Sequence, residues 1–440
     1  MLLTALVLIP YLAVFSLIIY RSRFFQPDGI GRTLSLLLFY IKSIAGILFG
    51  YFYSLYGHGG DTFTFFETSL KITSLISEDP VRYIKAVTGL GDQSDLQVFY
   101  AGLKGWYTYE PYFNDSRTII RINALIGLLS FGKYYVHSVF FSFLSFTGSI
   151  GLFRFFSNMS EIPPSKLLLP AFLIPSVLFW MSGANKEGIL SLVMGLTLYQ
   201  YSLILKRDDK IYHMILFFIL CLMFVHIKAY LLVMLLPALV AMAWSSRNLH
   251  ARSWLKYSLV YIGFFAGISL ASVVLERADA FQVLHSKRYN FEALAAAAPE
   301  DSRSYYDAVD FEPEPASVLK ASLPAFIATL TRPTVTDAKG IKGWLVVIEG
   351  VLILLFVVYG LIRFNKLSLN LNSNLFWFCI FFVVSNYVLI GLTTPVLGAI
   401  VRYKAPILPF LILIPVILST RGYEDRSYNF DLTKNPTTSL

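Results

Sequence analysis

Residues 343–362 read GWLVVIEGVLILLFVVYGLI, a run of twenty residues in which Glu349 carries the only charge. Twenty residues of α-helix are about 30 Å long, which matches the thickness of the hydrocarbon layer of a bilayer. The run therefore predicts a transmembrane helix. Runs of the same kind recur along the whole chain, so this stretch decides the fold class.

The composition agrees with that prediction. The chain has 440 residues, of which 56% are hydrophobic and only 14% are charged, whereas about 25% of the residues of a soluble domain are charged. Inside a bilayer every backbone polar group must be paired within the protein, so recurring apolar runs predict helices. We predict an all-α polytopic transmembrane helical bundle, and we exclude a soluble enzyme and a disulfide scaffold. Cys221 and Cys379 both lie in apolar runs, which suits buried thiols.

We predict about eleven spans, because each run is long enough to cross a bilayer. They cover residues 1–20, a segment ending near Tyr56, and residues 134–153, 167–183, 188–205, 211–225, 229–245, 257–275, 343–362, 375–394 and 405–420. Arg21 and Arg23 directly follow the first run, a charge order that opposes a cleaved signal peptide and favours an N-terminus outside the cell.

Two long hydrophilic segments, 57–133 and 276–342, interrupt the spans, and the alternation of spans puts both on one side. The other connections are short and basic, including the stretch from Arg32 to Lys42. The positive-inside rule places these basic connections and the tail 421–440 in the cytoplasm, so both long loops are extracytoplasmic. The whole chain, 1–440, forms one transmembrane domain. Its net charge of +9 is then a signal of orientation and does not indicate binding to nucleic acid.

The candidate site residues lie at tight outer turns. A helical bundle brings such turns together, and clustered basic side chains suit a phosphate or diphosphate. The basic candidates for that role are Lys186, Lys228, Arg332, Arg402 and Lys404; Glu187 and His226 lie in the same turns, with Arg121 and His58 as supporting residues. The alternative is that each Lys or Arg extends to lipid headgroups.

Asp61 and Glu349 are the informative acids. Asp61 follows the glycine-rich turn 57–60, at or near the N-cap of the next segment. It serves either as that cap, or as a general base or ligand of a divalent cation, Mg²⁺ or Mn²⁺. Glu349 lies inside a span, where an ionisable side chain marks a functional cavity or an ion pair with a neighbouring helix.

Four stretches resemble the bacterial integral-membrane glycosyltransferases of the C-type superfamily (GT-C) and the related O-antigen polymerase-like proteins. They are Gly59-Gly60-Asp61-Thr62; Pro175-Ser176 with Phe179-Trp180-Met181-Ser182-Gly183 and Lys186-Glu187; Ile227-Lys228-Ala229-Tyr230; and Arg402-Tyr403-Lys404 with Pro406 and Pro409. The resemblance spans most of the chain. An additional helix before the acidic loop distinguishes the chain from the usual layout of the superfamily.

The resemblance implies transfer of a sugar or oligosaccharide from a polyprenyl phosphate or diphosphate to a hydroxyl of a glycan or protein, at the outer face of the bacterial inner membrane. It gives Asp61 the role of base or metal ligand. Lys186, Lys228, Arg402 and Lys404 would bind the donor phosphate. From their place in the outer turns we add Arg332 as a further phosphate ligand, and Glu187 and His226 as catalytic residues.

Three alternatives stay open at this point. A polysaccharide polymerase or ligase would use the basic residues and a histidine, with Asp61 structural. A transporter or flippase for a lipid-linked saccharide would line its path with polar residues at mid-membrane depth and broken helices. A structural scaffold would leave the basic turns without a role.

Overall fold

The computed structural model describes residues 2–55, 60–90, 115–206, 210–247, 252–274, 279–297 and 305–420. Within these ranges the chain is helical, and the only β-type pairing is an isolated bridge between Tyr305 and Val396. The all-α prediction is confirmed for this part of the chain. His58, parts of both predicted outer loops and the tail 421–440 lie outside the described residues.

Helices make up most of the described part of the chain. The first half of the chain holds α1 (Leu2–Arg21), α2 (Arg32–Ser54), α3 (Gly60–Glu78), α4 (Pro80–Thr88), α6 (Asp115–Ser130), α7 (Tyr134–Met159), α8 (Pro164–Leu168), the π-helical turn η2 (Leu169–Leu173), α9 (Pro175–Ser182) and α10 (Lys186–Leu205). The second half holds α11 (Ile211–Arg247), α12 (Ser253–Val274), α13 (Ala280–Ala297), α14 (Pro315–Thr331), the 3₁₀ turn η5 (Val335–Asp337), α15 (Gly340–Ile362), α16 (Lys366–Leu371), α17 (Ser373–Thr393), α18 (Leu397–Lys404) and α19 (Leu408–Ser419).

Seven of the described helices are long and apolar enough to cross a membrane. They are α2, α7, α10, α11, α12, α15 and α17. Two bent pairs raise the number to nine if each is one span: α8 and η2 with α9, bent by 52°, and α18 with α19, bent by 58°. The chain is therefore a multi-pass helical membrane protein, since helices of this length and composition suit the bilayer.

Helix α11 breaks at Lys228, whose backbone leaves the helical region with φ −154° and ψ 78°. Before the break, His213 Nδ1 lies 2.7 Å from Gln200 Oε1 near the C-terminal end of α10. After the break, Tyr201 of the same end donates a hydrogen bond to the carbonyl oxygen of Leu239. Both halves of α11 therefore contact the same end of α10, so the chain reverses direction at the break.

Helices α7 and α10 pack backbone against backbone. A Cβ atom added to Gly195 of α10 would lie 1.9 Å from the carbonyl oxygen of Gly148 in α7. Beside this contact, Ser191 donates a hydrogen bond of 3.2 Å to the carbonyl oxygen of Ser145. Small residues allow such close approach, which is how helices gain packing contacts in lipid. This pair forms the centre of the bundle.

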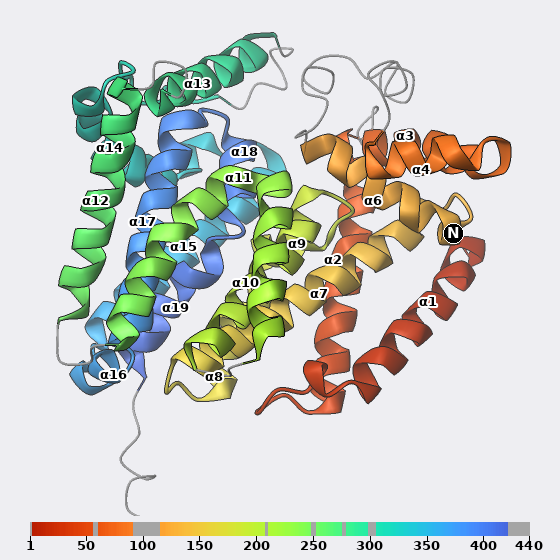
Figure 1. Ribbon diagram of the computed structural model, residues 1–440, viewed down its shortest axis with the longest axis horizontal. Helices are drawn as coiled ribbons and strands as arrows, with labels where there is room; N and C mark the ends of the chain where they lie inside the picture. Colours follow the sequence, from red (N-terminus) through yellow and green to blue (C-terminus); the bar gives the residue numbers. More distant parts are fainter. Residues whose placement is uncertain are drawn as a thin grey trace, which may run out of the picture.

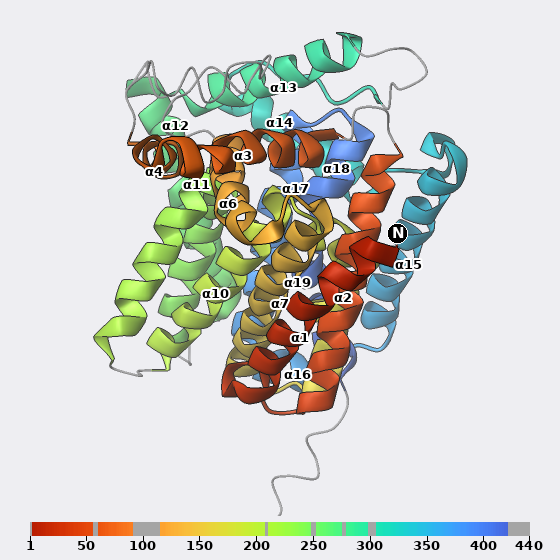
Figure 2. The ribbon, with the colours of Figure 1, turned by 90° about the vertical axis from the view of Figure 1, so that its right-hand side faces the viewer.

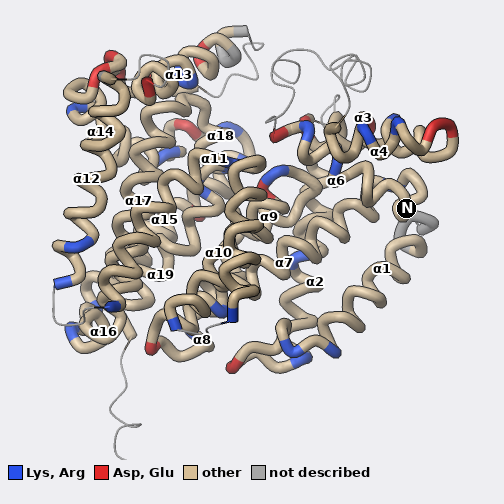
Figure 3. The backbone as a smooth tube through the Cα atoms, viewed as in Figure 1, with Lys and Arg blue, Asp and Glu red and all other residues tan. Residues whose placement is uncertain are grey.

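The helices from the two predicted outer loops lie at one end of the molecule. Helices α3 and α4 run across that end, and α13 lies at the same end, whereas α8 and α16 lie at the opposite end (Figures 1 and 2). Charged residues gather mainly towards the two ends of the bundle (Figure 3). This distribution is typical of a protein whose middle section faces hydrocarbon.

The placement of Lys42 in an inner basic connection is wrong. Helix α2 already begins at Arg32, so Lys42 lies in the middle of a candidate membrane span. Its side chain is buried against α7, and its ammonium donates a hydrogen bond of 3.0 Å to Ser149. The small hydroxyls of α7 provide a polar surface there, which the pattern of α2 alone does not reveal.

Candidate functional site

Four charged side chains from four separate helices meet at the end of the bundle that carries α3. Glu187 Oε1 accepts a hydrogen bond of 2.9 Å from the Lys228 ammonium and lies 2.8 Å from Arg402 Nε. Arg402 Nη1 in turn lies 3.4 Å from Oδ2 of Asp61. Arg402 therefore joins two carboxylates, and Glu187 joins two cations. We call these four residues, Asp61, Glu187, Lys228 and Arg402, the ion-pair cluster.

The position of Glu187 follows from the cap of α10. The Asn185 side chain accepts a hydrogen bond of 3.0 Å from the backbone N–H of Gly188 and donates one of 3.1 Å to the carbonyl oxygen of Trp180. This double contact holds the connection between α9 and α10, so Glu187 projects from the first helical turn. A carboxylate is favoured there because the N-terminal end of a helix carries partial positive charge.

Asp61 is held by the first turn of α3. The helix begins at Gly60 with φ +61°, a conformation that favours glycine. The next residue after Asp61, Thr62, donates a hydrogen bond of 2.9 Å to the carbonyl oxygen of Ala184 and contacts the Tyr134 hydroxyl at 2.7 Å. Asp61 thus lies within the first turn, one residue after the helix begins, and Thr62 ties this turn to the start of α10.

Lys228 lies at the break in α11, directly opposite Glu187. Its ammonium also lies 4.5 Å from the centre of the Tyr403 ring, which is within the range of a cation–π contact. Tyr403 follows Arg402 in α18, so one short helix supplies two of the partners around the Lys228–Glu187 pair. The ring shields this pair from solvent and strengthens it.

A second ion pair lies beside the cluster. Lys186 Nζ contacts Oδ1 of Asp115 at 2.8 Å, and Asp115 is the first residue of α6. Lys186 is close enough to Arg402 for their two charges to repel each other. Asp115 is a site residue that the sequence analysis missed, because it is one of many charged residues in a long hydrophilic segment and has no motif around it.

Exposure separates the charged side chains into two sets. Glu187 is 0% exposed, Lys228 5% and Lys186 6%, whereas Arg402 is 19%, Asp61 36% and Asp115 41% exposed. A ligand can therefore reach the two aspartates and one side of Arg402 first. Glu187 was predicted as a catalytic residue; its complete burial suits a role in holding Lys228 and Arg402.

Lys404, Arg332 and Glu349 occupy a neighbouring group. The Lys404 ammonium donates to the carbonyl oxygens of Thr329 and Arg332, at 3.1 and 2.6 Å. These carbonyls end α14, where a cation is favoured. Glu349 accepts hydrogen bonds from the backbone N–H and the hydroxyl of Ser176, the former at 2.8 Å, and its charge attracts that of Lys404.

Arg332 binds Asp337 through one nitrogen, at 2.8 and 2.9 Å to the two oxygens, and lies over the Tyr306 ring at 4.3 Å. Burial raises the pKa of the Asp337 carboxyl, but the hydrogen bonds from Thr334 and the Arg332 charge outweigh burial, so the pKa lies below its usual value. Arg332 thus has an acidic partner of its own.

His226 and Arg121 have contacts within or between their own helices. His226 Nδ1 lies 2.9 Å from the carbonyl oxygen of Leu222 in its own helix. The Arg121 guanidinium of α6 lies against Gly89 at the end of α4. His58 lies outside the described residues.

Asp61 does not fit a divalent-cation site in this arrangement. The Arg402 guanidinium contacts both Asp61 and Glu187, so positive charge already occupies the space between the two carboxylates. Among the residues that the structure describes, no group of three or more His, Cys, Asp and Glu side chains is placed to hold a metal ion.

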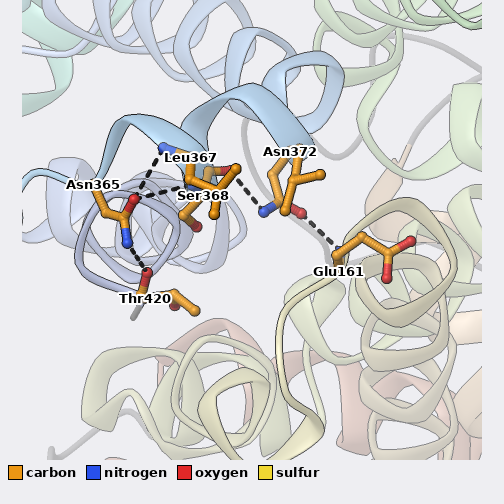
Figure 4. Close-up of a pocket in the computed structure, with 7 residues that line it drawn as sticks. Glu161, Asn365, Leu367, Ser368, Asn372 and Thr420 are labelled. Carbon is orange, nitrogen blue, oxygen red and sulfur yellow. Dashed lines mark hydrogen bonds between the residues drawn. The ribbon is translucent and has the colours of Figure 1, made fainter. Parts of the chain in front are cut away.

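A small polar pocket lies at the opposite end of the bundle, around α16 (Figure 4). It is lined by Glu161, Asn365, Leu367, Ser368, Leu371, Asn372 and Thr420. The Asn365 side chain donates to the carbonyl oxygen of Thr420 at 3.0 Å, and the Asn372 side-chain oxygen accepts from the backbone N–H of Glu161 at 2.8 Å. These amides tie neighbouring segments together, so the pocket is a structural junction.

The fold and the cluster together define a class: a multi-pass helical membrane protein with paired acids and bases at one end of its bundle. No family model, curated protein or solved structure matches the chain.

Proposed function

We propose that the chain is a membrane glycosyltransferase that takes a sugar from a polyprenyl phosphate or diphosphate and transfers it to a hydroxyl of a glycan or protein. The observation that supports this proposal best is the meeting of Asp61, Glu187, Lys228 and Arg402 at helix starts and helix breaks. Charged residues at broken membrane helices are typical of binding sites for charged substrates.

The chemistry assigns different roles to the buried and the exposed groups. Lys186, Lys228 and Arg402 stabilise the phosphate as the bond between the anomeric carbon and its phosphate oxygen breaks and the electron pair stays on that oxygen. The acceptor oxygen forms the new bond to the anomeric carbon, and its proton passes to Asp61, the more exposed carboxylate. Glu187 holds Lys228 and Arg402 in place.

The finer topology belongs to the same proposal. Counting α1, the two halves of α11 and each bent pair as spans gives about eleven, the number that the sequence predicts. An odd number puts the two termini on opposite sides of the membrane, and the basic connections favour the orientation with the N-terminus outside and the tail 421–440 in the cytoplasm. The cluster then faces the periplasm or exterior of a bacterial inner membrane.

Replacing Asp61 with Asn tests the proposed base. In proteoliposomes with a labelled polyprenyl-phosphate sugar and a hydroxyl acceptor, we expect Asp61→Asn to lower the transfer rate by about 100-fold or more, since general base catalysis typically contributes that much. Asp310→Asn is the matched control, because Asp310 pairs with Arg288 in another part of the chain. Full activity of Asp61→Asn would exclude Asp61 as the base.

A second candidate function, transport of a lipid-linked saccharide, is favoured by one observation. Two candidate spans are bent by more than 50°, and Lys42 lies buried in the middle of a third. Broken helices and intramembrane charges are typical of transporters. Movement of a labelled lipid-linked sugar between the leaflets of protein-containing liposomes, without cleavage of the sugar–phosphate bond, would favour this function over transfer.

A further inference from the structure

Two neighbouring cations of the site each contact a half-exposed acid. Lys186 pairs with Asp115 at 2.8 Å, and Arg402 contacts Asp61 at 3.4 Å. Both cations are mostly buried, whereas the two acids are 41% and 36% exposed. The acids come from α6 and α3, and the cations come from α10 and α18. The exposed carboxylates therefore lie on the solvent side of the cations.

The two contacts of Arg402 differ in strength. Its Nε lies 2.8 Å from the fully buried Glu187 carboxylate, whereas its Nη1 lies 3.4 Å from Asp61. A distance of 3.4 Å is at the long end for a charged hydrogen bond. Ion pairs with exposed partners are also weak, because water competes for both charges. Glu187 thus holds Arg402, and Asp61 is the partner that a ligand can replace.

We propose that Asp61 and Asp115 are competing carboxylates, which occupy the anion site formed by Arg402 and Lys186 until a phosphate replaces them. Lys186 directly precedes Glu187, whose carboxylate contacts Arg402 at 2.8 Å, so the two cations lie close together. A phosphate dianion, which neutralises both at once, suits them better than two separate carboxylates. Planar guanidinium groups bind phosphate oxygens in pairs. This inference rests on the proposed function for the identity of the phosphate, and it adds a regulation of the same site.

The competition sets an order of binding. While Asp61 contacts Arg402 at 3.4 Å, the guanidinium engages that carboxylate oxygen. When a phosphate binds Arg402, the phosphate oxygens neutralise the guanidinium, and the Asp61 oxygen that contacted it can accept a hydrogen bond from a hydroxyl instead. The phosphate-bearing donor therefore binds first and the acceptor second.

The test measures phosphate binding without any transfer reaction. The full chain in an uncharged detergent is titrated with inorganic phosphate and with pyrophosphate, and the full chain in phosphatidylcholine nanodiscs is titrated with a polyprenyl phosphate. We expect Asp115→Asn to bind about threefold more tightly than the unmodified chain, which is the effect of removing one partly exposed ion pair. Lys186→Gln should bind about tenfold more weakly, since it loses a charged hydrogen bond.

Asp310→Asn is the matched control, because it removes an acid that is paired with Arg288 outside the cluster, and its affinity should not change. Asp115→Ser repeats the test if the Asn variant melts at a lower temperature. If the Asp115 variant binds only polyprenyl phosphate more tightly, the ligand is a lipid headgroup. If it also binds the inorganic anions more tightly, free phosphate is sufficient. Both results support the competition between carboxylate and phosphate.

Unchanged or weaker binding of both Asp115 variants would overturn the proposal. The outcome is separable from the proposed function. Tighter phosphate binding by the Asp115 variants without any sugar transfer would support the competition and contradict the proposed glycosyltransferase activity. Sugar transfer with unchanged phosphate binding would support the enzyme activity and contradict the competition.

Discussion

At the scale of single residues, burial decides what each charge can do. Glu187 is fully buried and contacts two cations, whereas Asp61, which contacts Arg402, is half-exposed. A buried carboxylate that contacts two cations stabilises the fold, because removing it leaves both positive charges poorly solvated and without a partner. The half-exposed Asp61 can meet a substrate without such a cost.

The effect of Glu187 on stability is large and measurable. We expect Glu187→Ala to lower the free energy of unfolding by about 3 to 5 kcal/mol, since it leaves Lys228 and Arg402 buried without their partner. Glu187→Gln should lose less, because the amide oxygen still accepts hydrogen bonds. Thermal unfolding in detergent micelles measures both variants.

Glu292→Gln is the control for that measurement, since Glu292 pairs with Arg288 on the same helix and is 33% exposed. A change of less than 1 kcal/mol is expected for such a pair. Equal melting temperatures of Glu187→Ala and the unmodified chain would show that the buried cluster does not stabilise the fold.

Prediction from sequence succeeds best at this scale where a charge interrupts an apolar run. Lys228 lies between two such runs, and the break in α11 is found there. Lys42 shows the limit of the method, because a charge near the start of a run predicts a connection, yet the α7 hydroxyls allow it to be buried in a helix. Asp115 could not be found, since pairing with Lys186 is a tertiary contact that no local pattern encodes.

At the scale of helices, close packing matters most between α7 and α10. Gly195→Ala places a Cβ atom 1.9 Å from the Gly148 carbonyl oxygen, so the helices must separate. We expect a loss of about 1 to 3 kcal/mol, the usual cost of overpacking. The measurement is thermal unfolding in detergent.

Gly267→Ala in α12 is the matched control, because a Cβ atom there would meet nothing within 4 Å. It should be neutral or stabilising, since alanine favours helix more than glycine does. Similar losses in both variants would mean that backbone contact between α7 and α10 is unimportant.

The helices themselves are the part of the fold that sequence predicts well. Length and apolar composition are local properties, so α15, α17 and α12 appear where the runs lie. Helices α3, α4 and α13, from the two predicted outer loops, are less predictable, because their packing across the end of the bundle depends on residues distant in the sequence.

At the scale of the whole molecule, the sidedness of the two ends is testable. In a chain with Cys221 and Cys379 replaced by Ala, a single cysteine is introduced in place of Lys71 of α3, Lys287 of α13 or Lys166 of α8. All three positions are exposed, and together they report on the two ends of the bundle. We expect a membrane-impermeant thiol reagent added to intact cells to label positions 71 and 287 but not 166, because the positive-inside rule places the basic connections in the cytoplasm.

Cells made permeable before labelling provide the control, since position 166 should then react as well. Labelling of position 166 in intact cells, with positions 71 and 287 unreactive, would reverse the orientation of the whole chain. The assignment of the cluster to the outer face would fall with it.

The length of α10 also fixes the depth of the site. From Glu187 to Leu205 the helix rises about 27 Å at 1.5 Å per residue, close to the thickness of the hydrocarbon layer. In the proposed topology, Glu187 and the cations around it lie at one boundary of that layer, level with the headgroups of a single leaflet. A lipid whose phosphate belongs at that boundary can bring it to Arg402 while its tail stays in the hydrocarbon, so such a substrate need never leave the membrane.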